Sequence, residues 1–318
     1  MKKFFVLTIL FLIIIVIGIF FWWQSATSPV DPSNTSQKSF TISQGESIRT
    51  IGESLEKEGL IRNASAFYLL VKWHKFDNKI QSGSFALSPS VSLSAITEKL
   101  MHGSLDYWLI VPEGKRAAEI AEILKTKAPN YDKAWENDLE ENEGYLFPDS
   151  YRIPANDSID TIISLMRKNF DTKFATIGIV SKPKKEIVTI ASLVEREAKF
   201  SEDRPLVASV IYNRLNINMG LQIDASLQYA LGYSVQEHTW WRQNLTVDDL
   251  NLDSPYNTKL NTGLPPTPIC NPGLSSLEAA AHPAATDYLY YVSDSQGHLH
   301  FAKTLDQHTS NIQKYNVQ

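Results

Sequence analysis

The sequence predicts an α+β protein that is attached to a membrane through its N-terminus. Three observations lead to this prediction. An apolar run over residues 4–23 is long enough for one membrane-spanning helix. Short strand–turn–helix patterns recur over residues 39–142, and amphipathic helices followed by a two-strand pattern fill residues 143–318. With 43% apolar and 20% charged residues, the 318-residue chain differs from disordered and collagen-like proteins and can form hydrophobic cores.

The overall charge and the cysteine content exclude several classes of protein. Thirty basic and 35 acidic residues give a net charge of -5, which argues against a general nucleic-acid-binding protein. The single cysteine, Cys270, excludes an internal disulfide and a zinc site built from several cysteines.

The apolar run over residues 4–23 is interrupted only by Thr8 and Gly18. At about 1.5 Å per residue, a helix of this length spans roughly 30 Å, which is the thickness of a bilayer's hydrocarbon core. Trp22 and Trp23 fall where an aromatic belt would lie at the membrane surface. We therefore expect a transmembrane anchor.

A cleaved signal peptide is the main alternative to an anchor. Its apolar region would be about 7–15 residues long and would end at a small-residue cleavage site, which residues 24–26 do not provide. Residues 24–38 are rich in Ser, Thr, Pro, Asn and Asp and predict a short extended tether.

The basic residues around the run predict its orientation. Lys2 and Lys3 precede it, and the next basic residue is Lys38. Because positive charge favours the cytoplasmic side, we expect residues 1–3 in the cytoplasm and the remainder of the chain outside it.

Three stretches of the exported part share a strand–turn–helix pattern, and the one at residues 84–100 shows it only loosely. The two clearer ones begin at residue 40, within 39–105, and at residue 109, within 106–142. A single offset aligns four pairs of residues in them: Gly45 with Gly114, Ile51 with Ile120, Glu53 with Glu122, and Leu55 with Leu124. A glycine between strand and helix suits a turn, and aliphatic residues three or four positions apart share one helix face. We expect two small α+β units, with chance similarity as the alternative.

The pattern changes after residue 143. Residues 143–151 are aromatic and turn-rich, and helical periodicity follows. The sequence predicts helices over 159–174, 186–198, 206–215 and 275–281, and a hairpin with strands at 288–293 and 298–302.

Several kinds of chemistry can be set aside from the motifs. The sequence contains no Gly-rich phosphate loop, dinucleotide fingerprint, Gly-x-Ser-x-Gly elbow or His-Glu-x-x-His motif. His298 and His300 would share one strand face, but such pairs are common on exposed hairpins and a metal site needs further ligands. We therefore expect neither a metal nor a cofactor.

Two carboxylates on the helix over 186–198 are candidates for acid–base chemistry. Glu195 and Glu197 lie at opposite edges of its apolar stripe. Aliphatic neighbours raise the pKa of a carboxyl group, which suits a general acid for glycosidic cleavage. The alternative is that both are ordinary surface glutamates beside Arg196 and Lys199. The helical pattern alone does not choose between the two.

Polar and aromatic residues are dense after this helix. Gln222, Asp224, Tyr256 and Asn257 precede a segment rich in Pro and Gly over 263–273. Loops of this kind carry binding sites, and flat aromatic rings with amide and carboxylate groups suit sugar rings and N-acetyl groups. Each residue alone could equally be a turn former or a helix cap.

The sequence resembles the MltG (YceG-like) family of membrane-anchored endolytic murein transglycosylases. The segment Ala-Ser-Leu-Val-Glu-Arg-Glu at 191–197 carries much of the resemblance. The other matching blocks are 143–151, 207–215, 221–224, 256–258, 263–266, 271–273 and the hairpin at 288–301. Eight blocks in the family's order are far more specific than any single one.

The resemblance implies the domain organisation. Residues 4–23 would be the anchor, 24–38 the tether and 39–105 a LysM-like module, which is a small α+β peptidoglycan-binding fold. Residues 106–142 would hold a second α+β unit and a connection, and 143–318 a lytic transglycosylase-like α+β catalytic domain.

The resemblance also implies the site. The family's catalytic glutamate maps onto Glu195, and Glu143, Gln222, Asp224, Tyr256 and Asn257 are the expected substrate-binding residues. The chain departs from the family's pattern at Ser150, Ile223, Lys259 and Thr267. The last two departures affect the loop that would contact substrate.

The implied activity is cleavage of the MurNAc–GlcNAc bond of nascent peptidoglycan without water. It would leave 1,6-anhydro-MurNAc ends and terminate glycan elongation at the bacterial plasma membrane. Peptidoglycan strands are the expected partners, with peptidoglycan synthases as candidates. A non-catalytic murein-binding scaffold is one alternative, and a hydrolase that uses Asp224 as its second carboxylate is another.

Overall fold

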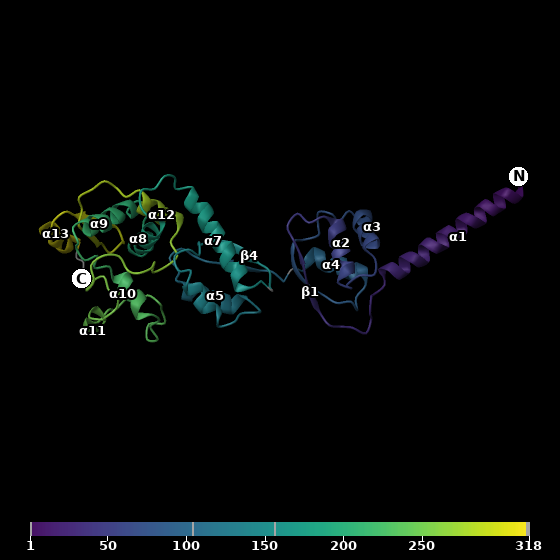
Figure 1. Ribbon diagram of the computed structural model, residues 1–318, viewed down its shortest axis with the longest axis horizontal. Helices are drawn as coiled ribbons and strands as arrows, with labels where there is room; N and C mark the ends of the chain where they lie inside the picture. The colour runs from purple at the N-terminus through teal and green to yellow at the C-terminus, as the bar shows by residue number, and fades with distance from the viewer. Residues whose placement is uncertain (1, 104, 156, 316–318) are drawn as a thin grey trace. The chain divides into compact units, whose positions relative to one another are not determined.

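The computed structural model describes residues 2–103, 105–155 and 157–315 (Figure 1). The chain divides into two compact units. The first consists of Met1–Tyr107 with Arg152–Asp157, and the second of Trp108–Tyr151 with Ser158–Gln318. Each unit is described by itself.

The first unit begins with the long helix α1 (Lys2–Thr27). It contains a candidate membrane span, Leu7–Thr27, with a mean hydropathy of 2.5 and no buried residue in its most apolar window. The helix extends beyond the predicted end at residue 23. It continues because Ala26 is small enough to be buried in the core of the first unit, against which Trp23 also packs.

The segment after α1 is bound to the first unit by hydrogen bonds. The Arg62 guanidinium donates to the carbonyls of Pro29 and Val30 at 2.8 and 3.0 Å. The Asp31 N–H donates to the carbonyl of Pro89 at 3.0 Å. The segment that the composition predicts to be an extended tether is therefore partly helical and partly held against the folded module.

The rest of the first unit is built from short strands and helices. Its elements are β1 (Lys38–Ile42), α2 (Ile48–Lys57), α3 (Ala64–His74), β2 (Gly83–Leu87) and α4 (Leu93–His102). β1 pairs with β2 antiparallel, with Phe40 opposite Phe85. The predicted turn is confirmed, because Gly45 has a φ of 81° between β1 and α2. Ser47, Asn63 and Ser92 cap the three helices with their side chains.

The pair of strands β3 (Tyr107–Ile110) and β4 (Ser150–Ile153) forms a second two-stranded sheet. In the second unit, Gly114 follows β3 with a φ of 75° and leads into α5 (Ala117–Lys127). This repeats the strand–turn–helix order of β1, Gly45 and α2, as the sequence pattern predicts. The helices α5 and α6 (Trp135–Glu140) belong to the same compact unit as residues 158–318.

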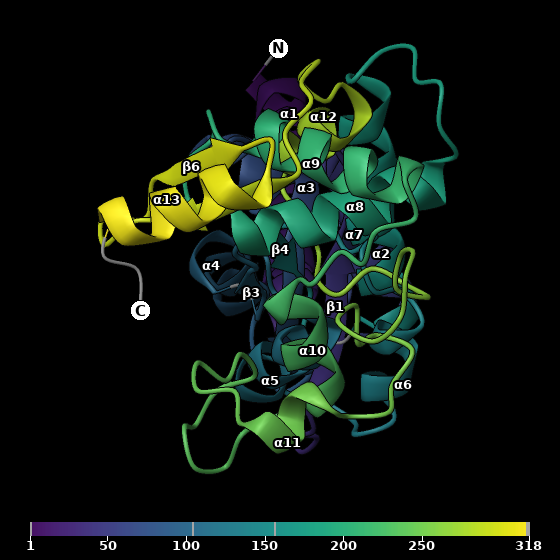
Figure 2. The same ribbon diagram turned by 90° about the vertical axis from the view of Figure 1, so that its left-hand side faces the viewer.

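The rest of the second unit consists of helices and one hairpin (Figures 1 and 2). Its elements in chain order are α7 (Ile159–Ala175), α8 (Lys184–Glu197), α9 (Arg204–Asn216), α10 (Asp224–Leu231), α11 (Val247–Leu250), α12 (Leu274–Ala281), β5 (Tyr290–Ser293), β6 (Leu299–Ala302) and α13 (Leu305–Tyr315). The helices α9, α10 and α12 pack against α8. The predicted hairpin is confirmed, with Tyr290 opposite Ala302.

The helix α8 is more deeply buried than its predicted single apolar stripe suggests. Every residue from Ile187 to Val194 is buried, including Thr189 and Ser192. The hydroxyl of Ser192 donates to the carbonyl of Thr189 at 2.7 Å and accepts the N–H of Ile269 at 3.0 Å, so its polar group is satisfied inside the core. α8 is therefore a central helix, and its charged side chains are confined to its first and last turns.

Candidate active site

Glu195 lies in the last turn of α8, where the first residues of two other helices meet it. Its side chain is 6% exposed. Its Oε1 accepts a hydrogen bond of 3.2 Å from Nη2 of Arg204, the first residue of α9. Its Oε2 accepts one of 2.9 Å from the backbone N–H of Gly273, the N-cap of α12. A cation and the N-terminus of a helix thus both donate to one carboxylate.

A second carboxylate, Glu113, lies beside the first. Nη2 of Arg204 is 3.8 Å from Oε2 of Glu113, so the two glutamates share one guanidinium. A Cβ on Gly273 would overlap the Glu113 carboxylate, which places that carboxylate directly against the backbone that binds Glu195. The Glu113 side chain is 51% exposed. Burial, followed by the negative charge of Glu195, raises the pKa of Glu113.

The turn after β3 brings Glu113 to this place. Gly114 has a positive φ, and a Cβ there would lie 3.4 Å from Cγ of Glu195. Its N–H donates to the carbonyl of Asn271 at 3.0 Å. The sequence alone did not predict Glu113 as a site residue and offered no second carboxylate other than Asp224. The available signal was the aligned pair of turns, in which the residue before Gly114 is acidic whereas the residue before Gly45 is Gln44.

Glu197 has a different environment. Its Oε2 accepts a hydrogen bond of 2.9 Å from the hydroxyl of Tyr291 in β5. Burial raises the pKa of Glu197, and the Tyr291 hydrogen bond opposes this shift. Arg196 separates the two glutamates in the sequence, and its guanidinium lies 3.8 Å from the ring centre of Trp241. The two candidates of the helical pattern therefore have separate partners, and Glu195 is the one beside Glu113.

Glu143, an expected substrate-binding residue, is buried at 6% exposure. Both of its carboxylate oxygens accept the N–H of Ala117 at 3.0 Å, and Oε1 also accepts from Nδ2 of Asn271 at 2.9 Å. Oδ1 of Asn271 accepts the N–H groups of Gly144 and Leu146, both at 2.9 Å. These contacts tie the start of α5 to the segment that leads to Gly273. Burial raises the pKa of Glu143 to about 8.

Asn257 is also fully buried. Its Nδ2 donates to the carbonyls of Leu250 and Leu252 at 3.1 and 2.9 Å, and its Oδ1 accepts the N–H of Lys259 at 3.1 Å. Its polar atoms are thus occupied within the protein. The expected contact of Glu143 and Asn257 with substrate has no support in this geometry, because the polar atoms of both side chains are occupied within the protein. Glu143 bonds to Ala117 and Asn271, and Asn257 bonds to the backbone of its own loop.

Gln222 and Asp224 are exposed at the start of α10. Gln222 has a φ of 55°, and its N–H donates to the carbonyl of Thr258 at 3.0 Å. The Asp224 carboxylate is 2.7 Å from Nζ of Lys259 and is 58% exposed. Both side chains are therefore free of the core and open to solvent.

Tyr256 is half-buried in a row of aromatic side chains. Its hydroxyl forms a hydrogen bond of 2.7 Å with Oγ1 of Thr267, and its ring centre is 4.9 Å from that of Tyr229. The guanidinium of Arg116 lies 4.2 Å from the Tyr229 ring centre and 4.9 Å from that of Trp240. Stacking of a cation on these rings keeps their orientation fixed.

Comparison with known proteins assigns the family. A family model described as the YceG-like family matches residues 40–314, which includes Glu113, Glu195 and Gly273. The chain belongs to the YceG-like family.

The similar proteins include three that are named endolytic murein transglycosylase and a solved structure of a yceG-like protein. A Bacillus subtilis (strain 168) protein named endolytic murein transglycosylase is 35% identical over 94% of this chain and 90% of its own length. Two Streptococcus pneumoniae proteins of the same name are 28% identical over 99% of this chain, which spans 65% of their length. The crystal structure of a yceG-like protein from Listeria monocytogenes is 32% identical, with a TM-score of 0.55 over 87% of this chain and 99% of that one.

The hairpin histidines of this YceG-like chain have protein partners. Nε2 of His300 lies 2.9 Å from Oδ2 of Asp294, and the His298 ring stacks on Phe200 with ring centres 4.2 Å apart. Within the part of the chain that the structure describes, no group of three or more His, Cys, Asp and Glu side chains is arranged to hold a metal ion.

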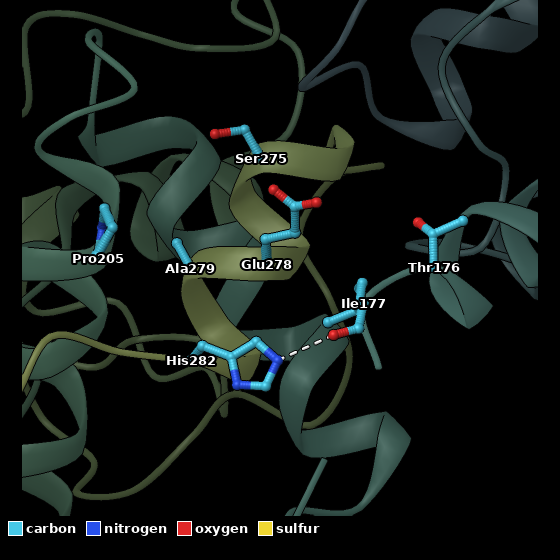
Figure 3. Close-up of a pocket in the computed structure, with 7 residues that line it drawn as sticks. All are labelled: Thr176, Ile177, Pro205, Ser275, Glu278, Ala279 and His282. Carbon is cyan, nitrogen blue, oxygen red and sulfur yellow. Dashed lines mark hydrogen bonds between the residues drawn. The ribbon is translucent and has the colours of Figure 1, made fainter. Parts of the chain in front are cut away.

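A pocket of about 390 Å³ on the second unit is separate from these carboxylates (Figure 3). Glu278 of α12 and His282, the residue that follows α12, both line it, and Nε2 of His282 lies 3.0 Å from the carbonyl of Ile177. None of its lining residues is a predicted site residue.

Proposed function

We propose that the protein is a membrane-anchored endolytic murein transglycosylase that cleaves the MurNAc–GlcNAc bond without water. The observation that carries the proposal is the environment of Glu195, which accepts hydrogen bonds from Arg204 and Gly273 and lies beside Glu113. It is supported by the names of the Bacillus and Streptococcus relatives.

The proposed reaction uses Glu195 twice. In its protonated form it donates a proton to the glycosidic oxygen, so that the bond to C1 of MurNAc breaks and the alcohol of the next sugar leaves. The resulting carboxylate removes the proton of the MurNAc C6 hydroxyl, whose oxygen attacks C1. The products are a 1,6-anhydro-MurNAc end and a free hydroxyl on GlcNAc, and Glu195 is protonated again.

The neighbours of Glu195 stabilise its ionised form between the two steps. The Gly273 N–H and the Arg204 guanidinium are already in place, so they need no reorganisation when the proton leaves. Nε of Arg204 is buried and has no hydrogen-bond partner among the described residues. The half-exposed Glu113 carboxylate is the group that would stabilise positive charge developing at C1.

The predicted binding residues divide into two groups in this proposal. The exposed Gln222 and Asp224 and the half-buried Tyr256 are placed to contact the glycan. Glu143 and Asn257 act indirectly, because their hydrogen bonds hold the segments that carry Gly273 and Tyr256.

The first unit would determine where in the cell the reaction takes place. The α1 helix is long and apolar enough to cross a bilayer once, with Lys2 and Lys3 on the cytoplasmic side. The strand–helix–helix–strand order of β1, α2, α3 and β2 supports a LysM-like module. This arrangement would restrict cleavage to strands near the outer surface of the plasma membrane, where elongation by synthases is terminated.

A hydrolytic reaction is the second candidate, and Glu113 is the observation that favours it. Glycoside hydrolases use two carboxylates on either side of the bond, and this site contains two. Mass spectrometry of the products of peptidoglycan digestion separates the candidates. The transglycosylase leaves anhydro ends, whereas a hydrolase leaves reducing ends that are about 18 mass units heavier, which corresponds to one water. Intact strands after digestion would instead support a non-catalytic murein-binding scaffold.

A further inference from the structure

The first unit contains an apolar groove between the anchor helix α1 and the helix α3. Its volume is about 480 Å³. It is lined from α1 by Ile19, Trp22 and Trp23, and from α3 chiefly by Leu69, Trp73 and His74. The C-terminal half of α3 therefore lies alongside the last apolar turns of α1.

The outer side of α3 is unusually apolar for a surface exposed to water. Trp73 is 86% exposed and Leu69, one turn earlier, is 48% exposed. Trp22 across the groove is 42% exposed. Isolated exposed apolar residues are ordinary, but a contiguous group that includes two tryptophans indicates a contact with another apolar phase.

The position of α3 relative to α1 is set by packing rather than by a flexible link. Ala26 of α1 is buried in the same core cluster as Phe67 and Val71 of α3. The hydrogen bonds from Arg62 to Pro29 and Val30 hold the chain immediately after α1. The depth of α1 in a membrane therefore determines the depth of α3.

The length of α1 places the groove at the membrane surface. The apolar run from Phe4 to Trp23 spans roughly 30 Å at about 1.5 Å per residue. With Phe4 at the inner edge of the hydrocarbon core, Trp23 therefore lies at its outer edge. Ile19 is four residues, or about 6 Å, below that edge. Trp73, which lines the same groove as Ile19, must then lie at the boundary between acyl chains and headgroups.

We infer that the end of α3 is a second membrane contact, in which Leu69 and Trp73 insert into the interfacial region of the outer leaflet beside α1. This inference rests on the proposed membrane anchor. Tryptophan prefers this region because its ring is apolar and its N–H is polar. Lys75 and Lys79 are exposed near the same end, where their amines can reach lipid phosphates, whereas Lys72 is paired with Asp77. The contact fixes the orientation of the first unit on the bilayer.

Site-directed spin labelling of the full chain tests this inference. Single cysteines at Ser65, Leu69 and Trp73, which follow one face of α3 at four-residue spacing, would be labelled in vesicles of phosphatidylethanolamine and phosphatidylglycerol. Collisions with oxygen, which concentrates in lipid, would be compared with collisions with a water-soluble nickel chelate. The native Cys270 is buried, and the unsubstituted protein serves as the labelling blank.

We expect the ratio of oxygen to nickel accessibility to rise from Ser65 through Leu69 to Trp73. Ile13→Cys in α1 is the control for the anchor, and Ile179→Cys, at a position 97% exposed in the second unit, is the control for water. If the label at Trp73 matches that at Ile179 while Ile13 reports lipid, the inference is wrong and the anchor stands. If Ile13 reports water, the anchor itself is wrong. Shielding of the Trp73 label from both reagents would mean that a protein covers α3, which also overturns the inference.

Discussion

The backbone N–H of Gly273 donates a hydrogen bond of 2.9 Å to the carboxylate of Glu195. Two features of Gly273 allow it to contact both glutamates. Gly273 caps α12 and so has an N–H without a helical partner. It also lacks a Cβ, which leaves room for the Glu113 carboxylate on its other side. The same residue thus serves as a hydrogen-bond donor to one glutamate and as a contact surface for another.

Replacement of Glu195 by Gln should abolish glycan cleavage while the fold is retained. The amide cannot donate and then accept the proton, and loss of a general acid–base group typically costs about 10²–10⁴-fold in rate. Release of glycan fragments measures the activity, and circular dichroism checks the fold. Glu197→Gln is the matched control, because it lies on the same helix turn and bonds to Tyr291 instead. The assignment is wrong if the control loses activity and Glu195→Gln keeps it.

Replacement of Glu113 by Gln should lower kcat about tenfold or more and leave KM nearly unchanged. Its charge acts on the transition state, in which C1 becomes positive, and each factor of ten corresponds to about 1.4 kcal/mol. Kinetics on purified uncrosslinked glycan strands measure both constants. Asp224→Asn is the control, since the exposed Asp224 should affect KM more than kcat. Equal effects of the two substitutions on kcat would refute a special role of Glu113.

Introduction of a side chain at Gly273 should disable the site without unfolding the protein. The methyl group of Gly273→Ala would overlap the Glu113 carboxylate and displace it. We expect a loss of activity similar to that of Glu113→Gln, with a melting temperature close to that of the parent. Gly103→Ala is the matched control, because a Cβ there meets only the Lys99 carbonyl at 3.5 Å. Full activity in Gly273→Ala would argue against the close approach of Glu113.

The buried Glu143 should make stability depend on pH. Its pKa rises from 4.5 to about 8 on folding because burial disfavours the charged form. The folded state therefore holds the proton more tightly than the unfolded state. Its contribution to stability is full below about pH 4.5 and is lost as the pH rises toward about 8.

Denaturant unfolding of the parent and of Glu143→Gln at several pH values measures this effect. The difference in free energy of unfolding between the two proteins should move in favour of the Gln variant between pH 5 and pH 8, by on the order of a few kcal/mol. A difference that stays constant over this range would show that Glu143 does not titrate there.

Local patterns in the sequence predicted much of the fold. The apolar run of α1, the turns at Gly45 and Gly114 and the β5–β6 hairpin depend on neighbouring residues, and the structure contains all of them. Burial on all sides of α8 was not predicted, because Thr189 and Ser192 look polar in sequence. The Ser192 hydroxyl accepts the N–H of Ile269 only after that segment packs against the helix.

The site was only partly predictable for the same reason. Glu195 lies on a periodic helix, so the pattern predicts it as a candidate together with Glu197, and the family resemblance favours Glu195. Glu113 belongs to a turn after β3, and only tertiary packing brings it to Arg204 and Gly273. Glu143 and Asn257 resemble ligand-binding residues in sequence, but buried loop backbone needs hydrogen-bond partners, and these side chains provide them.

Digestion of peptidoglycan in water labelled with oxygen-18, followed by mass spectrometry of the new glycan ends, tests the central proposal most directly. If Glu195 directs the C6 hydroxyl of MurNAc to C1, the parent protein will produce anhydro ends without the label, and Glu195→Gln will produce none. New reducing ends that contain oxygen-18 would show that water is the acceptor, and the protein would then be a hydrolase.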